Sequence, residues 1–437
     1  MKTRKMKDSG VEWLGSVPEG WKVLRMKCCL RNISEKGHPD AEVLSLYRDL
    51  GVVPKSSRDD NHNVTGEDTT QYKFVRIGDL VINKMKAWQG SLAVSGYTGI
   101  VSPAYYVCRF NGLPIERGYA HYLMRNRRHA QEFERLSTGM RVGQWDLGID
   151  DFMRVPLVYP PLPEQRAIAA YLDKRCAKID AMVADAKKLI EEYKAWKASL
   201  IFEAVTGKVD VKSGKLRAKG ELRDSGVEWI GQVPEGWKIQ RFKFVVSKLR
   251  KGSGITKEEV FEDGDVPCVR YGEIYSKYAY SFDECYSRTR IELQAERVDV
   301  NKGDILFACT GELVEEIGKN IVYLGSSPCV AGGDIMVASH NQNSVFLNYY
   351  LNCHSSQYQK SRNKAKLKVV HVKTSDIENL IVLLPLLPEQ RAIAEYLDRK
   401  CAAIDRVVAE KERLIADLER YKKSLIFECV TGKREVA

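Results

Sequence analysis

The stretch LPEQRAIAAYLDKRCAKID, residues 162–180, decides the fold, because the chain repeats it as LPEQRAIAEYLDRKCAAID at residues 387–405. The similarity extends over residues 162–208 and 387–433, where 29 of 47 positions are identical at an offset of 225. Pro163 suits the first position of a helix. Both copies therefore predict a helix of about 40 residues, roughly 60 Å long at 1.5 Å per residue.

Both predicted helices carry apolar residues three and four positions apart, the spacing of a coiled-coil seam. In the first helix these are Ile168, Leu172, Ile179, Met182, Ala186, Leu189, Tyr193, Trp196 and Leu200, and in the second they are Ile393, Leu397, Ile404, Val407, Leu414, Leu418, Tyr421 and Leu425. Because each helix follows an equivalent half, we expect the two to pair antiparallel. The alternative is that each helix packs only on its own domain.

A second repeat opens each half of the chain. DSGVEWLGSVPEGWKV at residues 8–23 recurs as DSGVEWIGQVPEGWKI at residues 224–239, whereas the sequences between the repeated segments barely resemble each other. Two copies of one frame with different inserts suit a molecule that reads two different things with one geometry. The predicted class is α+β, with two pseudo-symmetric mixed α/β domains and two long helices. The boundaries are 1–160 for the first domain, 161–208 for its helix, 209–223 for a linker, 224–385 for the second domain and 386–437 for its helix.

Short apolar runs and Gly-Asp turns fill the two domains in the same order. Residues 79–82, 104–107 and 157–159 predict strands, and residues 118–136 and 345–358 predict helices. We expect Asp79 and Asp304 to cap turns and the paired tryptophans of the opening segments to anchor them.

The composition favours a polyanionic partner. Lysine and arginine exceed aspartate and glutamate by 69 − 58 = 11, which suits nucleic acid; a merely solvated basic surface is the alternative. The phosphate-cradling, dinucleotide-binding and HExxH metal motifs are absent. A metal site is therefore not expected, and neither a signal peptide nor a membrane span is predicted.

Basic and amide side chains after the predicted helices and strands are the candidates for contact with nucleic acid. Lysine and arginine neutralise phosphates, while glutamine and arginine reach base edges. The candidates are Lys84, Lys86, Gln89, Arg127, Arg128, Arg141 and Gln144 in the first half, and Lys248, Arg250, Arg270, Tyr271, Arg362, Lys364, Lys366 and Lys368 in the second.

The ordered duplicate resembles the DNA-specificity subunit of Type I restriction–modification enzymes. The resemblance rests on PPLPEQRAI at residues 160–168 and LLPEQRAI at residues 386–393, each followed by Tyr-Leu-Asp, and on the two opening segments. It covers essentially the whole chain. The second copy has Leu-Pro-Leu at residues 384–386 where the first has Pro-Pro, and it lacks the glycine corresponding to Gly139, so its contact loop is expected to differ in shape.

The resemblance implies that each domain reads one half of a split sequence in double-stranded DNA, while the helices set the half-site spacing and dock two modification subunits. The chain itself would be a non-catalytic subunit, not an enzyme, and would bind no cofactor. Methylation with S-adenosylmethionine, and ATP and Mg²⁺ use by restriction subunits where present, would belong to those partners in a prokaryotic cytoplasm. The implied docking residues are Glu164, Gln165, Arg166, Glu389, Gln390 and Arg391. The alternatives are a specificity chain for a combined nuclease–methyltransferase, a stand-alone DNA-binding regulator, and a structural coiled-coil protein.

Overall fold

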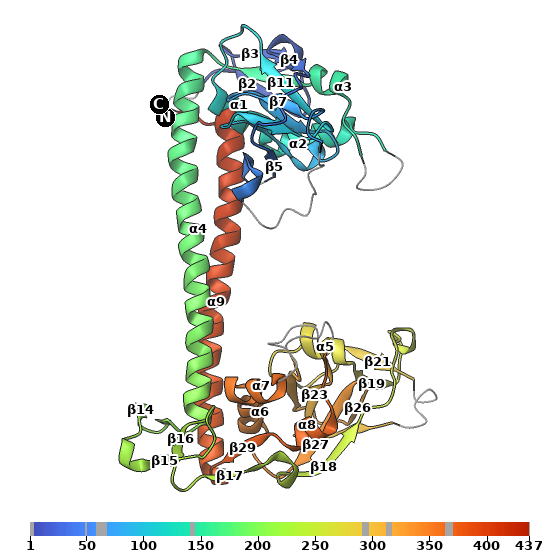
Figure 1. Cartoon of the computed structure of the whole chain (residues 1–437), viewed down its shortest axis with the longest axis vertical. Coiled ribbons are helices and arrows are strands. Elements are labelled where there is room, and N and C mark those ends of the chain that lie inside the picture. Colours follow the sequence, from blue (N-terminus) through green and yellow to red (C-terminus); the bar gives the residue numbers. More distant parts are fainter. Residues whose placement is uncertain are drawn as a thin grey trace. The chain divides into compact units, whose positions relative to one another are not determined.

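The computed structural model describes residues 4–48, 50–57, 68–139, 145–290, 297–311, 317–362 and 370–436. The chain forms two compact units. Unit 1 contains Met1–Lys187 and Glu412–Ala437, and unit 2 contains Lys188–Lys411. Each unit therefore includes one mixed domain and parts of both long helices (Figure 1).

Unit 1 is built around a four-stranded antiparallel sheet in the order β4-β11-β8-β9. Its strands are β1 (Met6–Asp8), β2 (Ser16–Pro18), β3 (Lys22–Arg25), β4 (Leu30–Ile33), β5 (Leu44–Tyr47), β6 (Gly51–Pro54), β7 (Lys73–Val75), β8 (Leu80–Asn83), β9 (Leu92–Val94), β10 (Gly99–Val101), β11 (Tyr105–Phe110) and β12 (Pro156–Tyr159). Its short helices are η1 (Met26–Cys28), η2 (Lys55–Ser57), η3 (Ala87–Gln89), α1 (Arg117–Arg125), α2 (Arg127–Leu136) and α3 (Ile149–Arg154).

Unit 2 repeats this order in its five-stranded sheet, β18-β27-β23-β25-β20. Its strands are β13 (Val209–Asp210), β14 (Lys215–Leu216), β15 (Leu222–Asp224), β16 (Gln232–Pro234), β17 (Lys238–Arg241), β18 (Val246–Lys251), β19 (Val266–Val269), β20 (Ser281–Phe282), β21 (Ser287–Thr289), β22 (Asp299–Val300), β23 (Ile305–Ala308), β24 (Thr310–Gly311), β25 (Asn320–Tyr323), β26 (Cys329–Ala331), β27 (Ile335–His340), β28 (Val370–His371) and β29 (Ile381–Leu384). Its short helices are η4 (Lys219–Glu221), η5 (Phe242–Phe244), η6 (Lys257–Glu259), α5 (Tyr271–Ser276), α6 (Ser344–Asn352), α7 (His354–Ser361) and α8 (Thr374–Glu378). The two dissimilar inserts therefore share one central strand order, which confirms the predicted α+β class with two related domains.

The prediction of a single helix over residues 118–136 and over residues 345–358 is wrong, because the structure has two consecutive helices in each place. Asn126 is extended, with ψ 156°, and separates α1 from α2, and Cys353 does the same between α6 and α7 with ψ 163°. The Asn126 side chain accepts hydrogen bonds from the backbone N–H groups of Arg128 and His129, which satisfies donors that a new helix start leaves open.

The long helices are α4 (Leu162–Val205) and α9 (Leu387–Val430). In unit 1 the first part of α4 packs on the last part of α9, and Lys422 Nζ lies 2.6 Å from Asp180 Oδ1. In unit 2 the last part of α4 packs on the first part of α9, and Lys197 Nζ lies 2.7 Å from Asp405 Oδ2. The pairing is thus antiparallel in both units, and the same Lys–Asp contact occurs twice at the repeat offset of 225.

The seam differs in detail from the predicted one. Met182, Leu189 and Trp196 are 43%, 39% and 54% exposed, while Cys176 and Ile190 are buried. The prediction skipped Cys176, and at Met182 and Leu189 it selected the wrong one of two adjacent apolar residues. Leu414 and Tyr421 of α9 are exposed as well.

Each long helix begins at a repeated junction with its own domain. The indole N–H of the buried Trp21 donates to Glu164 Oε2 at 2.8 Å, and Arg4 ion-pairs with the same carboxylate. In unit 2, Trp237 donates to Glu389 at 3.2 Å and Arg217 ion-pairs with it at 2.7 Å. These contacts confirm that the opening tryptophans anchor the repeated segments.

Segment 209–223, predicted as a linker, is folded and supplies Arg217 to this junction. Within it β13 and β14 pair as a hairpin, and the backbone N–H of Arg217 donates to Lys208 O at 2.8 Å. Nearby, Gly207 has φ +72° and sits so close to Pro234 and Trp237 that a Cβ atom would clash. Glycine is therefore required where α4 ends against the second domain.

Candidate nucleic-acid interface

In unit 1, Asp146 and Leu147, which follow one predicted basic segment, contact Lys84 of another predicted cluster. The backbone N–H of Leu147 donates to Lys84 O at 3.1 Å, and Lys84 Nζ lies 2.7 Å from Asp146 Oδ2. These contacts bring the chain that follows residues 140–144 against the connection between β8 and β9. Lys86 and Gln89 are exposed on that connection, whereas Arg141 and Gln144 lie outside the described residues.

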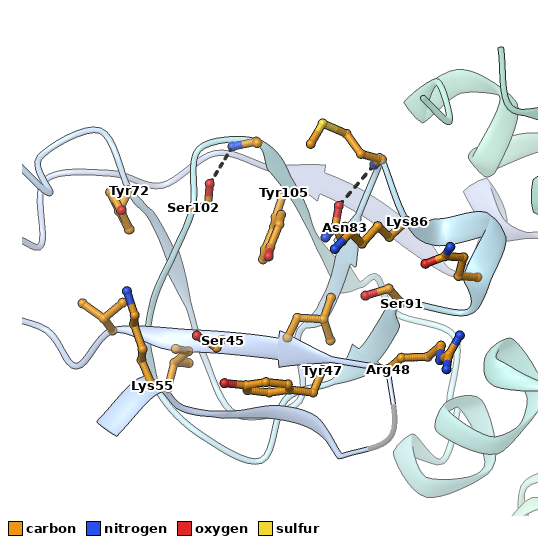
Figure 2. Close-up of a pocket in the computed structure, with 16 residues that line it drawn as sticks. Ser45, Tyr47, Arg48, Lys55, Tyr72, Asn83, Lys86, Ser91, Ser102 and Tyr105 are labelled. Atoms are coloured by element: carbon orange, nitrogen blue, oxygen red, sulfur yellow. Dashed lines mark hydrogen bonds between the residues drawn. The ribbon is translucent and has the colours of Figure 1, made fainter. Parts of the chain in front are cut away.

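A cavity of about 870 Å³ opens beside this connection (Figure 2). Three cationic side chains, those of Arg48, Lys55 and Lys86, line it, and no carboxylate does so among the residues that the structure describes. Polar and tyrosine side chains complete the wall: Ser45, Tyr47, Tyr72, Asn83, Gln89, Ser91, Ser102 and Tyr105. A concave cationic wall rich in hydrogen-bonding groups suits a polyanion whose bases present polar edges.

Sequence reasoning missed the β5–β6 hairpin, which supplies much of this wall. Arg48 directly follows β5, and Lys55 directly follows β6. The Arg125 guanidinium donates to Arg48 O and so ties this end of β5 to α1. Burial raises the pKa of Tyr105, so its phenol stays neutral and can donate a hydrogen bond. In the sequence, Gly51 could have indicated this hairpin, because glycine favours the turn conformation that it adopts here, with φ +80°.

Arg127 and Arg128 are exposed in the first turn of α2, and neither lines the cavity. The Arg128 guanidinium lies 6.0 Å from the centre of the Phe427 ring near the end of α9. It is therefore placed against the long helix.

In unit 2 the same backbone contact recurs. The N–H of Val372 donates to Cys309 O at 2.7 Å, which is the Leu147–Lys84 contact shifted by 225 residues. β24 and β28 pair here, so the chain that follows residues 363–369 lies against the end of β23. Lys364, Lys366 and Lys368 fall in that segment, outside the described residues.

The helix α5 approaches the same strand end. The Tyr275 hydroxyl donates to Thr310 O at 2.8 Å, and Tyr271 at the start of α5 is 41% exposed. Arg270 is half-buried and ion-pairs with Glu273 at 3.0 Å, which already neutralises its charge locally. Lys248 and Arg362 are exposed, and the Arg362 guanidinium lies 5.4 Å from the centre of the Trp229 ring.

The structure corrects the predicted nucleic-acid contact of Arg250, because its guanidinium points into the domain. It lies 3.2 Å from Asp304 Oδ2 and donates to Ser339 Oγ at 3.1 Å. Asp304 in turn accepts from the backbone N–H of Asn301. We therefore assign Arg250 a structural role in place of a DNA contact, and the expected turn-capping role of Asp304 is confirmed.

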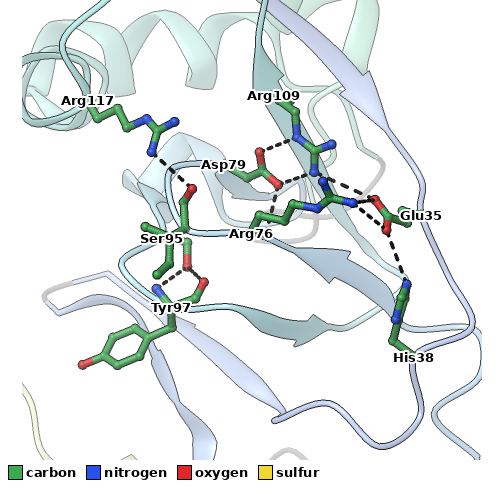
Figure 3. A network of polar contacts seen from close by, with 9 residues as sticks. Glu35, His38, Arg76, Asp79, Ser95, Tyr97, Arg109 and Arg117 are labelled. Carbon is green, nitrogen blue, oxygen red and sulfur yellow. Dashed lines mark hydrogen bonds and ion pairs between the residues drawn. The ribbon is translucent and has the colours of Figure 1, made fainter.

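Unit 1 contains the corresponding structural network (Figure 3). Arg109 donates to both carboxylate oxygens of Asp79 at 2.9 and 2.8 Å, and Asp79 also caps the turn at Arg76 N. Arg76 extends the network to Glu35 at 3.1 Å. Hydrogen bonding to Asp79 raises the pKa of Arg109, which keeps the guanidinium protonated.

The predicted docking residues divide into two groups. Gln165 and Gln390 are fully buried: each amide donates to the carbonyl of the preceding proline segment and accepts from a backbone N–H of its own domain. They cannot touch a partner, which corrects that prediction. Glu164 and Glu389 are partly buried in the tryptophan junctions, and of the six residues only Arg166 and Arg391 are exposed.

The described residues contain no cluster of three or more histidine, cysteine, aspartate or glutamate side chains suited to a metal ion. Within the same residues, no helix is both long enough and apolar enough to cross a bilayer.

The predicted basic run 360–368 begins with Lys360. This side chain is fully buried in the domain and is not available to a ligand at the surface.

Comparisons with known proteins agree with the duplicated architecture. The family model of the Type I restriction modification DNA specificity domain matches residues 234–415. The Type I restriction enzyme MjaVIII specificity subunit of Methanocaldococcus jannaschii is 25% identical and covers 96% of this chain and 94% of that protein. A putative MjaX specificity subunit of the same organism is 23% identical, with 97% and 96% covered.

Solved structures share the fold. A chain from a study of complex assembly and conformational transition of the type I R-M system aligns with a TM-score of 0.70 at 16% identity, over 96% of this chain and 99% of that chain. The HsdS subunit of Thermoanaerobacter tengcongensis aligns with a TM-score of 0.51 at 17% identity, over 96% and 98%. The specificity-domain model covers the second domain and the first part of α9, and the two Methanocaldococcus jannaschii subunits match nearly the whole chain, so this chain is similar along its length to Type I restriction–modification DNA-specificity subunits.

Proposed function

We propose that each mixed domain reads one half of a bipartite, asymmetric DNA target, while α4 and α9 set the spacing of the halves and dock two modification subunits. The chain itself contributes recognition and no catalysis. S-adenosylmethionine, and ATP and Mg²⁺ where restriction subunits join, would be bound by the partners. A methyltransferase partner would extrude its target adenine from the duplex before modifying it.

One observation carries this proposal: the same backbone contact places different side chains at one position of the fold. Leu147 N–Lys84 O and Val372 N–Cys309 O both join the chain that follows a basic segment to the end of a central strand. Around the first contact lie Lys86 and Gln89, whereas α5 with Tyr271 lies near the second. A common frame with unlike contact groups suits two half-sites of unlike sequence.

The exposed apolar residues of the long helices support docking of a helical partner. Met182, Leu189 and Trp196 recur every seven residues on α4 beside the buried seam. On α9, Leu414 and Tyr421 repeat this spacing. A second heptad stripe on an already paired helix fits the knobs of an additional amphipathic helix, and we assign that role to the modification subunits.

A base-resolution map of adenine methylation tests the proposal. Cells with the modification subunits and this chain are expected to show one gapped, asymmetric motif that disappears when this chain is deleted. An unchanged map with intact partners would contradict it. Tight, sequence-specific binding by this chain without modification subunits would instead favour a stand-alone regulator, and a partner that both cuts and methylates would favour the combined enzyme.

The spacing role has its own test. One heptad added to both helices at matched seam positions keeps the pairing register and lengthens each helix by about 10 Å. The gap between the half-sites is then expected to grow by about three base pairs, at 3.4 Å each, while both half-sequences persist. An unchanged gap would show that the helices do not act as a ruler.

A further inference from the structure

The connection between β8 and β9, residues 84–90, forms a closed turn at the rim of the unit 1 cavity. Four backbone hydrogen bonds close it: Lys86 N to Asn83 O at 3.0 Å, Gln89 N to Lys86 O at 3.0 Å, Gly90 N to Ala87 O at 2.7 Å and Ser91 N to Lys86 O at 3.1 Å. Gly90 completes the turn with φ +81°, a conformation that favours glycine. The backbone of the 84–90 turn is therefore fixed by its own hydrogen bonds.

Side chains at the base of the 84–90 turn hold it to the domain. Ala87 is fully buried, and the indole N–H of Trp88 donates to Met85 O at 3.0 Å. The Trp88 and Trp145 rings lie 5.2 Å apart, and Lys84 is paired with Asp146. A base held by aromatic packing and an ion pair makes the turn a rigid support, as precise recognition requires.

The outer side of the 84–90 turn presents Met85, Lys86 and Gln89. All three are exposed, Met85 by 49%, and all three line the cavity. Lys86 is labelled in Figure 2. Within the described part of the chain, no hydrogen bond or ion pair engages the side chain of Lys86 or Gln89. The turn thus combines a fixed backbone with two polar groups available to a ligand.

The chemistry of these groups differs in what each can distinguish. A glutamine amide donates and accepts at once, and this matches N7 and the N6 amino group of adenine in the major groove. A lysine is a point charge suited to phosphate, and a methionine methyl packs on apolar surface such as the thymine methyl group. An A·T pair therefore fits the amide and the thioether together.

We propose that Gln89 reads an adenine in the half-site bound by the first domain, with Met85 against a neighbouring thymine methyl and Lys86 on the phosphate backbone. This proposal rests on the proposed function and deepens it to one base. The other amide on the cavity wall, Asn83, is buried, and its Oδ1 accepts from Met85 N at 3.2 Å. Asn83 therefore shapes the turn, and Gln89 is left to face the ligand.

The test uses the complex of this chain with its modification subunits and a library of randomised duplex DNA, followed by sequencing of bound and methylated molecules. In Gln89→Ala, one A·T position of one half-site is expected to lose its preference, which corresponds to a loss of roughly 5- to 150-fold in discrimination. In Gln89→Glu, the same position is expected to shift toward cytosine, because a carboxylate accepts from the cytosine amino group and is repelled by adenine N7.

Two controls keep the outcome decisive. Lys86→Ala is expected to weaken binding to all sequences evenly and to lower the slope of binding against salt by about one. The half-site of the second domain should be unchanged in every variant, which reports correct folding. If the variants bind DNA but are not methylated, the bound fraction is read alone.

A wild-type motif that stays intact in both Gln89 variants overturns this assignment and leaves the proposed function standing. A relaxed position that is not an A·T pair also overturns it. A wild-type complex that selects no gapped motif instead contradicts the proposed function itself.

Discussion

The two mixed domains bury an aspartate at the same place and pair it with an arginine from different strands. In the first domain Asp79 is held by Arg109 on β11. In the second domain the matching position on β27 is Ser339, and Arg250 reaches Asp304 from the neighbouring strand β18. The aspartate caps its turn in both domains, which shows that the frame fixes the acid and leaves the source of its partner free to change.

The two domains differ more strongly at a second pair of matched positions, where the buried side chains have different chemistry. Counted from the residue that precedes each helix, Phe133 of α2 corresponds to Lys360 of α7, and both are fully buried. Phe133 packs on Phe152, with ring centres 5.5 Å apart. Lys360 instead donates to Gly318 O, Asn320 Oδ1 and Leu351 O at 2.8, 2.8 and 2.6 Å. One domain fills the site with an aromatic ring and the other with a fully hydrogen-bonded ammonium group.

The largest expected effect is a dependence of the stability of unit 2 on pH, which tests the contrast between Phe133 and Lys360. Burial lowers the pKa of Lys360 to about 7, whereas the unfolded chain keeps the ordinary value of about 10.4. Between these values the unfolded state binds more protons, so the free energy of unfolding of unit 2 should rise with pH. From pH 6.5 to pH 9.5, the rise due to Lys360 is expected to be about 3 kcal/mol.

The measurement is urea unfolding of the full chain at both pH values, with hydrogen exchange to assign the change to unit 2. Lys360→Met, which keeps the length of the side chain, should remove the rise. Phe133→Leu in unit 1 is the matched core substitution that should leave the pH dependence unaltered. Parallel pH profiles for wild type and Lys360→Met would refute the role of the lysine.

Asp79→Ala and Asp304→Ala sharpen the first contrast. Asp79→Ala removes two bonds to Arg109 and one turn cap, and is expected to cost about 3 kcal/mol. Asp304→Ala removes one longer contact to Arg250 and its cap, and is expected to cost about 2 kcal/mol. Hydrogen exchange of β8 and β23 reports each unit separately, and equal losses of protection would contradict the predicted ranking.

Loss of the indole hydrogen bond should destabilise the two tryptophan junctions by similar amounts. Trp21→Phe and Trp237→Phe each keep the apolar packing but remove an indole N–H that donates to Glu164 or Glu389. We expect losses of about 1.5 kcal/mol in unit 1 and about 1 kcal/mol in unit 2, since the second bond is longer. Thermal unfolding of the full chain is the measurement; no loss in either variant would mean that the arginine alone holds each carboxylate.

The smallest effect concerns the two Lys–Asp contacts between the long helices. Lys197→Met and Lys422→Met each remove an exposed ion pair while keeping most of the stem in the seam. Each is expected to change the free energy of unfolding by less than about 1 kcal/mol, and by similar amounts. The difference from wild type should shrink at 1 M salt; a salt-independent loss would indicate altered packing instead.

Much of the fold follows from local patterns in the sequence. The repeated segments specify both long helices, and the Gly-Asp turns locate the strands that begin directly after Asp79 and Asp304. The seam was harder to place, because Met182 and Leu189 are each followed by another apolar residue, Val183 and Ile190. Periodicity alone cannot choose between such neighbours; the facing helix does so through packing.

The candidate site was predictable only in part. Lys86 and Gln89 follow a recognisable buried strand, which is why the sequence identifies them. Burial of Lys360 depends on Gly318 and Asn320, acceptors about 40 residues away in the chain, and no local pattern contains that information. The same holds for Arg250, whose partner Asp304 lies 54 residues further on.

The division of the chain has a consequence for synthesis on the ribosome. Unit 1 needs residues from the end of the chain: Val430 O lies 3.0 Å from the Tyr119 hydroxyl, and Leu425 and Cys429 belong to the same core as Trp21. Unit 2 is contiguous, from Lys188 to Lys411, and is therefore complete first. The domain that is translated first must wait, with part of its apolar core uncovered, until the last helix has emerged, and during that interval it is a natural client for chaperones.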